Sequence, residues 1–104
     1  MSFENHHVEG NFRQLGFTPR GSAAMEVMIG TVKLTAMEHP FLGVALWFTS
    51  VAGRSATQFE ITMPACASVE QIAGLIYVNF ELVFRDQAEI CKRYLEKFGS
   101  HLFQ

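Results

Sequence analysis

Few side chains in this sequence could carry out chemistry, and they are far apart. Cys66 precedes the start of a predicted helix, where the helix dipole favours a thiolate nucleophile. Such a nucleophile also needs a neighbouring base, and His39 is the only histidine in the middle of the chain. No spacing brings the two together, so we predict a structural or incidental role for Cys66. Cys91 lies on an apolar helix stripe and is predicted to be in the core.

The remaining histidines do not form a recognisable metal site. His6, His7 and His101 lie near the two ends of the chain, and no CxxC or HxxxH spacing is present. The carboxylates show no obvious buried pair for acid–base catalysis, and no phosphate-binding glycine motif occurs. We therefore predict no metal, no cofactor and no catalytic residues, and a protein that acts by binding rather than as an enzyme.

The composition indicates one globular domain, with an apolar content that is average to slightly high. The chain has 104 residues, of which 49% are hydrophobic and 17% charged, and its formal net charge is −2. Nucleic-acid binding usually requires a concentrated basic face. Here the one basic cluster, around Lys92, Arg93 and Lys97, alternates with Glu89 and Glu96 and reads as a solvated helix face. A nucleic-acid partner is therefore not expected.

The cellular location is predicted to be the cytoplasm. Two cysteines do not make a disulfide scaffold. No signal peptide is visible at the N-terminus. The longest apolar run, residues 72–84, is too short to span a bilayer, so no membrane partner is expected.

The first two thirds of the chain are predicted to form an N-terminal arm and a small sheet. Residues 1–21 are polar, rich in glycine and dotted with apolar residues, and we predict an N-terminal arm that packs on its own domain or on a neighbour. A short helix near residues 8–15 is an open alternative that Gly10 weakens. The single domain is predicted to cover residues 22–104.

Three strands are predicted in that domain. The first covers residues 25–34 with a bulge at Gly30, because its apolar positions change from odd to even there; a helix from Ser22 is the competing interpretation. The second covers residues 44–51, is apolar on both faces and should be central, with Trp47 in the core. The third covers residues 57–63 and alternates regularly.

The C-terminal third is predicted to be helical over residues 69–98. Ser68 and Gln71 match a capping box, and Gly99 marks the end. The fold class is therefore α+β: a three-stranded antiparallel β-meander packed against one long C-terminal helix, intact or broken, and preceded by the arm.

The first half of this helix has more apolar surface than one sheet can cover. One apolar stripe, which includes Phe80 and Phe84, continues in phase to Phe98 and should face the sheet. A second stripe ends near residue 84, and we predict that it binds a partner. Its residues are Ile72, Leu75, Asn79, Leu82 and Val83.

The length of the helix leaves two solutions. A continuous helix over residues 69–98 would be about 45 Å long, whereas a domain of this size is roughly 33 Å across. Either the chain breaks at Arg85–Gln87, with Asp86 capping a second helix that folds over the second stripe, or the helix stays long and the stripe meets another molecule. We favour the long helix, because the first stripe keeps its phase.

The predicted function is that of a small interaction protein: a regulator, adaptor or inhibitor that binds another protein and forms a homodimer. Small proteins of phages and plasmids that block host machinery have such a profile. The alternative is a small apolar-ligand-binding protein, or a small dimeric enzyme, with a pocket between sheet and helix and with Cys66, His39 or Tyr77 at its mouth.

Overall fold

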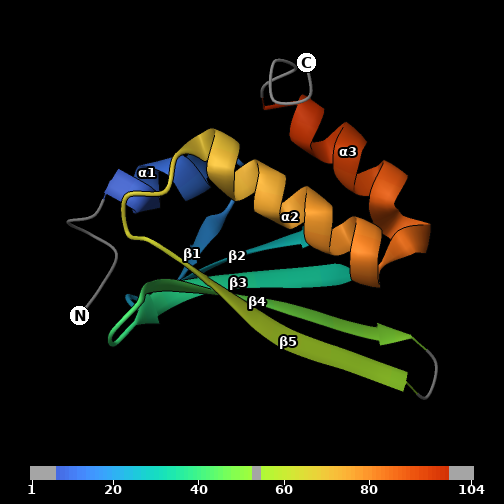
Figure 1. Cartoon of the computed structure of the whole chain (residues 1–104), viewed down its shortest axis with the longest axis horizontal. Helices are drawn as coiled ribbons and strands as arrows, with labels where there is room; N and C mark the ends of the chain where they lie inside the picture. Colours follow the sequence, from blue (N-terminus) through green and yellow to red (C-terminus); the bar gives the residue numbers. More distant parts are fainter. Residues whose placement is uncertain (1–6, 53–54, 99–104) are drawn as a thin grey trace.

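The protein has two layers, with helices packed on one face of an antiparallel sheet. The computed structural model describes residues 7–52 and 55–98. Figure 1 shows the helices on one side and the strands on the other, so the second face of the sheet carries no helix from this part of the chain. The predicted α+β class is confirmed.

The sheet is a meander of five strands in the described residues, in the order β1-β2-β3-β4-β5. The strands are β1 (Thr18–Arg20), β2 (Ala24–Ile29), β3 (Val32–His39), β4 (Gly43–Ala52) and β5 (Ser55–Met63). The predicted number of three strands was wrong. Residues 44–51 form an interior strand, because β4 lies between β3 and β5, but the central strand of the five is β3.

One of the two missed strands arose at Gly30, and the other is β1, which lies in the predicted arm. The change in apolar phase at Gly30 is a tight turn between β2 and β3, not a bulge within one strand, and Ile29 pairs with Val32 across it. Gly30 has a φ of 60°, which a residue with a Cβ rarely adopts. A two-residue turn and a bulge both shift the pattern by one position, so the sequence alone did not separate them.

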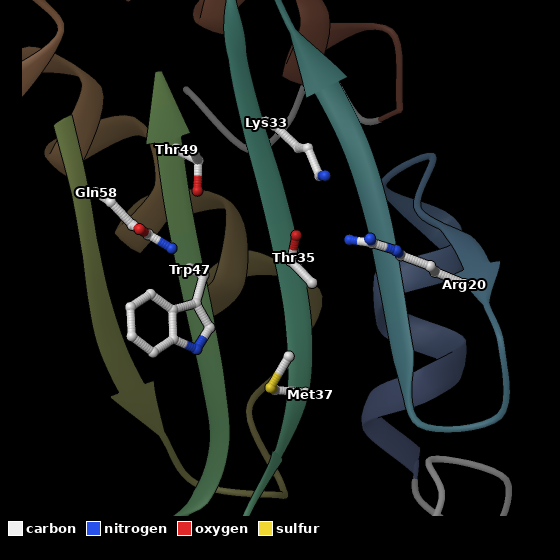
Figure 2. Close-up of a pocket in the computed structure, with 7 residues that line it drawn as sticks. All are labelled: Arg20, Lys33, Thr35, Met37, Trp47, Thr49 and Gln58. Carbon is white, nitrogen blue, oxygen red and sulfur yellow. The ribbon is translucent and has the colours of Figure 1, made fainter. Parts of the chain in front are cut away.

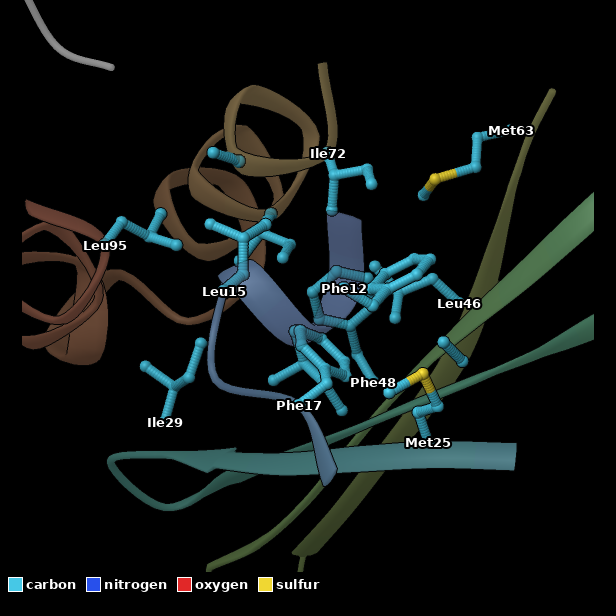
Figure 3. Close-up of a cluster of buried hydrophobic side chains, with 14 of the residues drawn as sticks. Phe12, Leu15, Phe17, Met25, Ile29, Leu46, Phe48, Met63, Ile72 and Leu95 are labelled. Atoms are coloured by element: carbon cyan, nitrogen blue, oxygen red, sulfur yellow. The ribbon is translucent and has the colours of Figure 1, made fainter. Parts of the chain in front are cut away.

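The predicted arm is part of the packed structure over its described residues. Residues 7–14 form helix α1 (His7–Gln14), and residues 18–20 form β1. The side chains of Phe12, Leu15 and Phe17 lie in the core beneath the other helices, where Figure 3 shows them together. Residues 1–6 lie outside the described part of the chain.

The C-terminal third is broken, contrary to the long helix that we favoured. Helix α2 (Val69–Val83) is followed by a short 3-10 turn, η2 (Arg85–Gln87), and by helix α3 (Ala88–Glu96). Phe84 leaves the helical conformation with φ −119° and ψ 57°. Its ring packs against Phe48, Phe59 and Phe80.

The break allows α3 to fold back instead of projecting from the domain. Cys91 and Leu95 of α3 are then fully buried, and the longest dimension of the molecule is 36 Å. Asp86 does not cap the second helix as the alternative expected, because the N-cap position is Gln87 and carries no side-chain cap. The predicted end at Gly99 lies outside the described residues.

The start of α2 agrees with the prediction. The Ser68 hydroxyl accepts a hydrogen bond from the Gln71 backbone N–H at 3.1 Å, and the Gln71 side chain accepts one from the Ser68 N–H at 2.8 Å. The first apolar stripe faces the core as predicted, with Ala73, Ile76 and Phe80 all buried.

Candidate functional site

Helix α2 presents apolar side chains to solvent after the chain has folded. We call this region the α2 surface. It consists of Leu75, Val78, Leu82 and Val83, which are 37%, 47%, 66% and 45% exposed. Scattered apolar residues are normal on a protein surface, but four on successive turns of one helix form a contiguous area.

The structure distributes the five residues of the predicted partner-binding stripe between the core and this surface. Ile72 is fully buried and Asn79 half-buried. Leu75, Leu82 and Val83 are exposed. The Asn79 side-chain amide donates a hydrogen bond to the Leu75 carbonyl at 2.7 Å, one helical turn back. Partner binding by these residues stays a prediction.

The α2 surface remains open because α3 covers another side of α2. Helix α3 packs against α2 and β2. The pKa of Tyr77 is raised, first by burial and then by the nearby Glu81 carboxylate, with smaller contributions from Glu89 and Cys91. Helix geometry places Leu75 about 160° from Tyr77 around α2. Although Ile72 of the second stripe is buried, Leu75, Leu82 and Val83 remain exposed after α3 has folded back.

An apolar groove lies next to the α2 surface. Its volume is about 440 Å³, and its apolar walls come from the end of β5 and from α2. The lining residues are Met63, Pro64, Ala67, Glu70, Gln71, Gly74, Leu75 and Val78. Leu75 and Val78 thus belong both to the groove and to the α2 surface, which places part of that surface beside the end of β5.

A further apolar pair was missed by the sequence analysis. Phe41 and Leu42, at the tip of the β3–β4 hairpin, are 90% and 58% exposed. The hairpin approaches the end of β5 closely, because a Cβ on Gly43 would lie 2.6 Å from the Met63 carbonyl oxygen. The sequence did contain a signal for this exposed pair, because two large apolar residues stand between Pro40 and Gly43 in a predicted connection.

The candidate chemical residues do not assemble into a reactive site. Cys66 is exposed. The His39 Nδ1 accepts hydrogen bonds from the N–H groups of Phe41 and Leu42 at 3.2 and 3.1 Å, so it organises the hairpin tip. Neither residue lines the groove, and neither does Tyr77. Within residues 7–52 and 55–98, no group of three His, Cys, Asp or Glu side chains could hold a metal.

The open face of the sheet carries a second concavity, of about 310 Å³ (Figure 2). Its lining residues are Arg20, Lys33, Thr35, Met37, Trp47, Thr49 and Gln58. Trp47 is half-buried here and is not a core residue, so the predicted core position was wrong. Because β4 is apolar on both faces, the alternation of the sequence did not say which face Trp47 occupies.

The cations of this concavity are partly neutralised. Glu26 Oε2 lies 3.5 Å from Arg20 Nη1 and 3.7 Å from Lys33 Nζ. The Glu26 carboxylate therefore forms ion pairs with both Arg20 and Lys33. This arrangement does not favour the concavity as an anion site.

Strand β5 forms one edge of the sheet over nine residues. Its first four residues and Glu60 and Thr62 are exposed, and Phe59 and Ile61 are only half-buried. The sequence predicted this strand over residues 57–63, and its edge position follows from its place as the last strand of the predicted meander, as observed.

Comparison of the chain with protein-family models, curated proteins and solved structures finds no significant match. Within the described residues, no helix is long and apolar enough to cross a membrane.

Proposed function

We propose that this chain is a non-enzymatic interaction protein, a small regulator, adaptor or inhibitor, that forms a homodimer through the α2 surface. The observation that supports the proposal most directly is the exposure of Leu75, Val78, Leu82 and Val83 after folding. The side chains that line the groove do not include Cys66, His39 or Tyr77, which supports binding rather than catalysis.

The apolar burial that this surface offers is comparable to the cost of association. Full burial of one large aliphatic side chain is worth about 1.5–3 kcal/mol. The combined exposure of the four residues is equivalent to roughly two such side chains, so each copy would gain about 3–6 kcal/mol and the two copies of a dimer about 6–12 kcal/mol. Association costs about 4–15 kcal/mol in lost freedom. Because the two ranges overlap, a tight dimer through the α2 surface needs a neighbouring contact.

The decisive experiment compares oligomeric state in the wild type and in the double variant Leu75→Glu with Leu82→Glu. Sedimentation equilibrium should give about twice the mass of one chain for the wild type and the mass of one chain for the variant, because two buried carboxylates oppose association. Met28→Glu is the matched control, since Met28 is 56% exposed but lies on β2. It should leave the dimer intact.

Circular dichroism separates loss of association from loss of folding. The double variant should keep the helical signal of the wild type. A wild type that sediments as a monomer at every concentration contradicts the homodimer. A double variant that unfolds shows that the two leucines are needed within one chain.

The groove favours one alternative, the binding of a small apolar ligand. Its walls include the apolar side chains of Met63, Leu75 and Val78. A solvatochromic fatty-acid probe should bind the monomeric double variant less tightly than wild type if the groove is a ligand site. A probe that does not bind wild type at all contradicts this alternative.

A further inference from the structure

The two edges of the sheet differ in how well they are protected against pairing. Edge strand β1 has three residues, and two of them are Pro19 and Arg20, which are typical of protected edges. The opposite edge strand, β5, has nine residues, no proline and a single charged residue, Glu60. A long edge with so little charge is available for pairing with another strand.

The pairing of β5 with β4 indicates which backbone groups point outward. Ala52 pairs with Ser55 across a two-residue connection, and such a pair is hydrogen-bonded in a tight hairpin. Hydrogen-bonded and non-hydrogen-bonded pairs alternate along an antiparallel ladder. Ser55, Thr57, Phe59, Ile61 and Met63 therefore bond to β4. The residues between them direct their N–H and C=O groups to the free edge; they are Ala56, Gln58, Glu60 and Thr62.

We propose that β5 pairs antiparallel with β5 of a second copy, about a two-fold axis at Phe59. The inference rests on the proposed function, because it specifies the homodimer contact. Phe59 is the midpoint of β5, so this centre pairs all nine residues. Gln58 then lies opposite Glu60 of the partner subunit in a hydrogen-bonded pair, and Ala56 opposite Thr62 of the partner subunit.

The charges select this register over its neighbours. An axis at Glu60 would place two carboxylates opposite each other, which is destabilising. An axis at Gln58 would place Glu60 opposite Ala56 of the partner subunit and leave the carboxylate without a polar pair. With the axis at Phe59, each Gln58 amide faces a Glu60 carboxylate across the strands and can donate to it, twice per dimer.

The same pairing supplies the contact that the α2 surface lacks. Leu75 and Val78 line one groove with Met63, the last residue of β5, so the helix and the edge strand meet at this end of the domain. Both copies of α2 would lie on the same face of one continuous sheet. Backbone hydrogen bonds along β5 and apolar burial from α2 then add in one interface.

Disulfide cross-linking tests both the pairing and its register. Gln58→Cys and Glu60→Cys are made separately in a Cys66→Ser background, in which the remaining Cys91 is buried. An equal mixture of the two proteins is oxidised gently. Opposed residues in a hydrogen-bonded pair have Cα atoms about 5.5 Å apart, within disulfide range. Identical residues in this register are about 8 Å apart and outside it. We expect the mixed disulfide dimer and neither homodimer.

Each outcome decides a separate point. A homodimer from Gln58→Cys alone moves the axis to position 58, and one from Glu60→Cys alone moves it to position 60; either overturns the register. Absence of all cross-links, while the Cys66→Ser protein still sediments as a dimer, overturns strand pairing but leaves dimerisation through α2. A protein that is monomeric in sedimentation overturns the proposed homodimer itself, and the strand pairing with it.

A charge series gives a second measurement that does not depend on oxidation. Gln58 is exposed, so its replacement should not disturb folding. Gln58→Lys should lower the dimer Kd and Gln58→Glu should raise it, each by about two- to thirtyfold, because two cross-strand pairs change per dimer. Equal effects of the two substitutions on Kd would overturn the pairing of Gln58 with Glu60.

Discussion

At the residue scale, Trp47 and Phe48 are neighbours in sequence with opposite environments. Phe48 is fully buried and stacks on Phe59 with ring centroids 4.9 Å apart. Trp47 lies on the open face, opposite Thr35 and Glu60 on the adjacent strands. Because successive side chains of a strand point to opposite faces, only one of the two could enter the core.

We predict that Phe48→Ala destabilises the protein far more than Trp47→Ala. Phe48→Ala leaves a cavity in the core and should lower the free energy of unfolding by about 3–5 kcal/mol. Trp47→Ala should cost less, because the open face can admit water. Urea denaturation followed by circular dichroism measures both. A loss at Trp47 as large as that at Phe48 would mean that the indole is packed as a core residue.

On α3, Cys91 is buried and Tyr94 is half-buried. Burial raises the pKa of the Cys91 thiol to about 12, from its ordinary 9.0. The pKa of Tyr94 also rises to about 12, through burial and then through the charge on Cys91, and its hydroxyl donates to the Leu15 carbonyl at 2.7 Å. Both groups are thus held in their neutral forms in the folded protein.

These shifts predict that stability falls at high pH. Above about pH 9 the unfolded chain releases the Cys91 proton while the folded chain keeps it, so the free energy of unfolding decreases until about pH 12. Below about pH 9 this contribution is fully present. Denaturant titrations across that range measure the decrease, which should be smaller in Cys91→Ala. An identical pH dependence in the two proteins would exclude Cys91 as its source.

At the element scale, the start of α2 is set by local chemistry and its end by packing. The reciprocal hydrogen bonds of Ser68 and Gln71 satisfy two N–H groups at the first turn. The end at Val83 has no comparable sequence signal. There Phe84 joins the aromatic cluster, and the Gln87 side chain accepts a hydrogen bond from the Thr31 N–H at 3.2 Å, which fixes η2 against the β2–β3 turn.

Removal of the cap should weaken α2 by a measurable amount. Ser68→Ala is expected to lower the free energy of unfolding by about 1 kcal/mol, because the Gln71 N–H loses its acceptor. Ser68→Asp retains an acceptor and serves as the control, with little change expected. Chemical denaturation of the three proteins side by side provides the comparison. Equal stability of wild type and Ser68→Ala would show that solvent replaces the cap without cost.

At the scale of the whole molecule, one face of the sheet is covered by helices and the β5 side is left exposed. Helix α3 packs against β2, and α1 packs against α2. Leu75 and Val78 of the α2 surface share the groove with Met63, the last residue of the edge strand β5. The proposed dimer would cover these three features at once, whereas a monomer would expose them all.

Association of folded chains predicts that thermal stability depends on concentration. A partner that binds only the folded state raises the apparent stability by mass action. The melting temperature of wild type should therefore increase with protein concentration, and that of Leu75→Glu with Leu82→Glu should not. Calorimetry over a hundredfold range of concentration tests this. A melting temperature that does not change with protein concentration in either protein would contradict a dimer coupled to folding.

Short-range patterns in the sequence determined the α+β class, the alternating strand over residues 57–63, the cap at Ser68 and the inward stripe through Phe80. Each depends on residues within a few positions of one another, so periodicity and hydrogen-bonding groups are sufficient. The tertiary structure alone decided the face occupied by Trp47, the break at Phe84 and the packing of α1. Those outcomes depend on contacts between residues distant in sequence: Phe84 meets Phe48 and Phe59, and the Tyr94 hydroxyl meets Leu15. Local patterns carry no information about which distant side chains will compete for the same core.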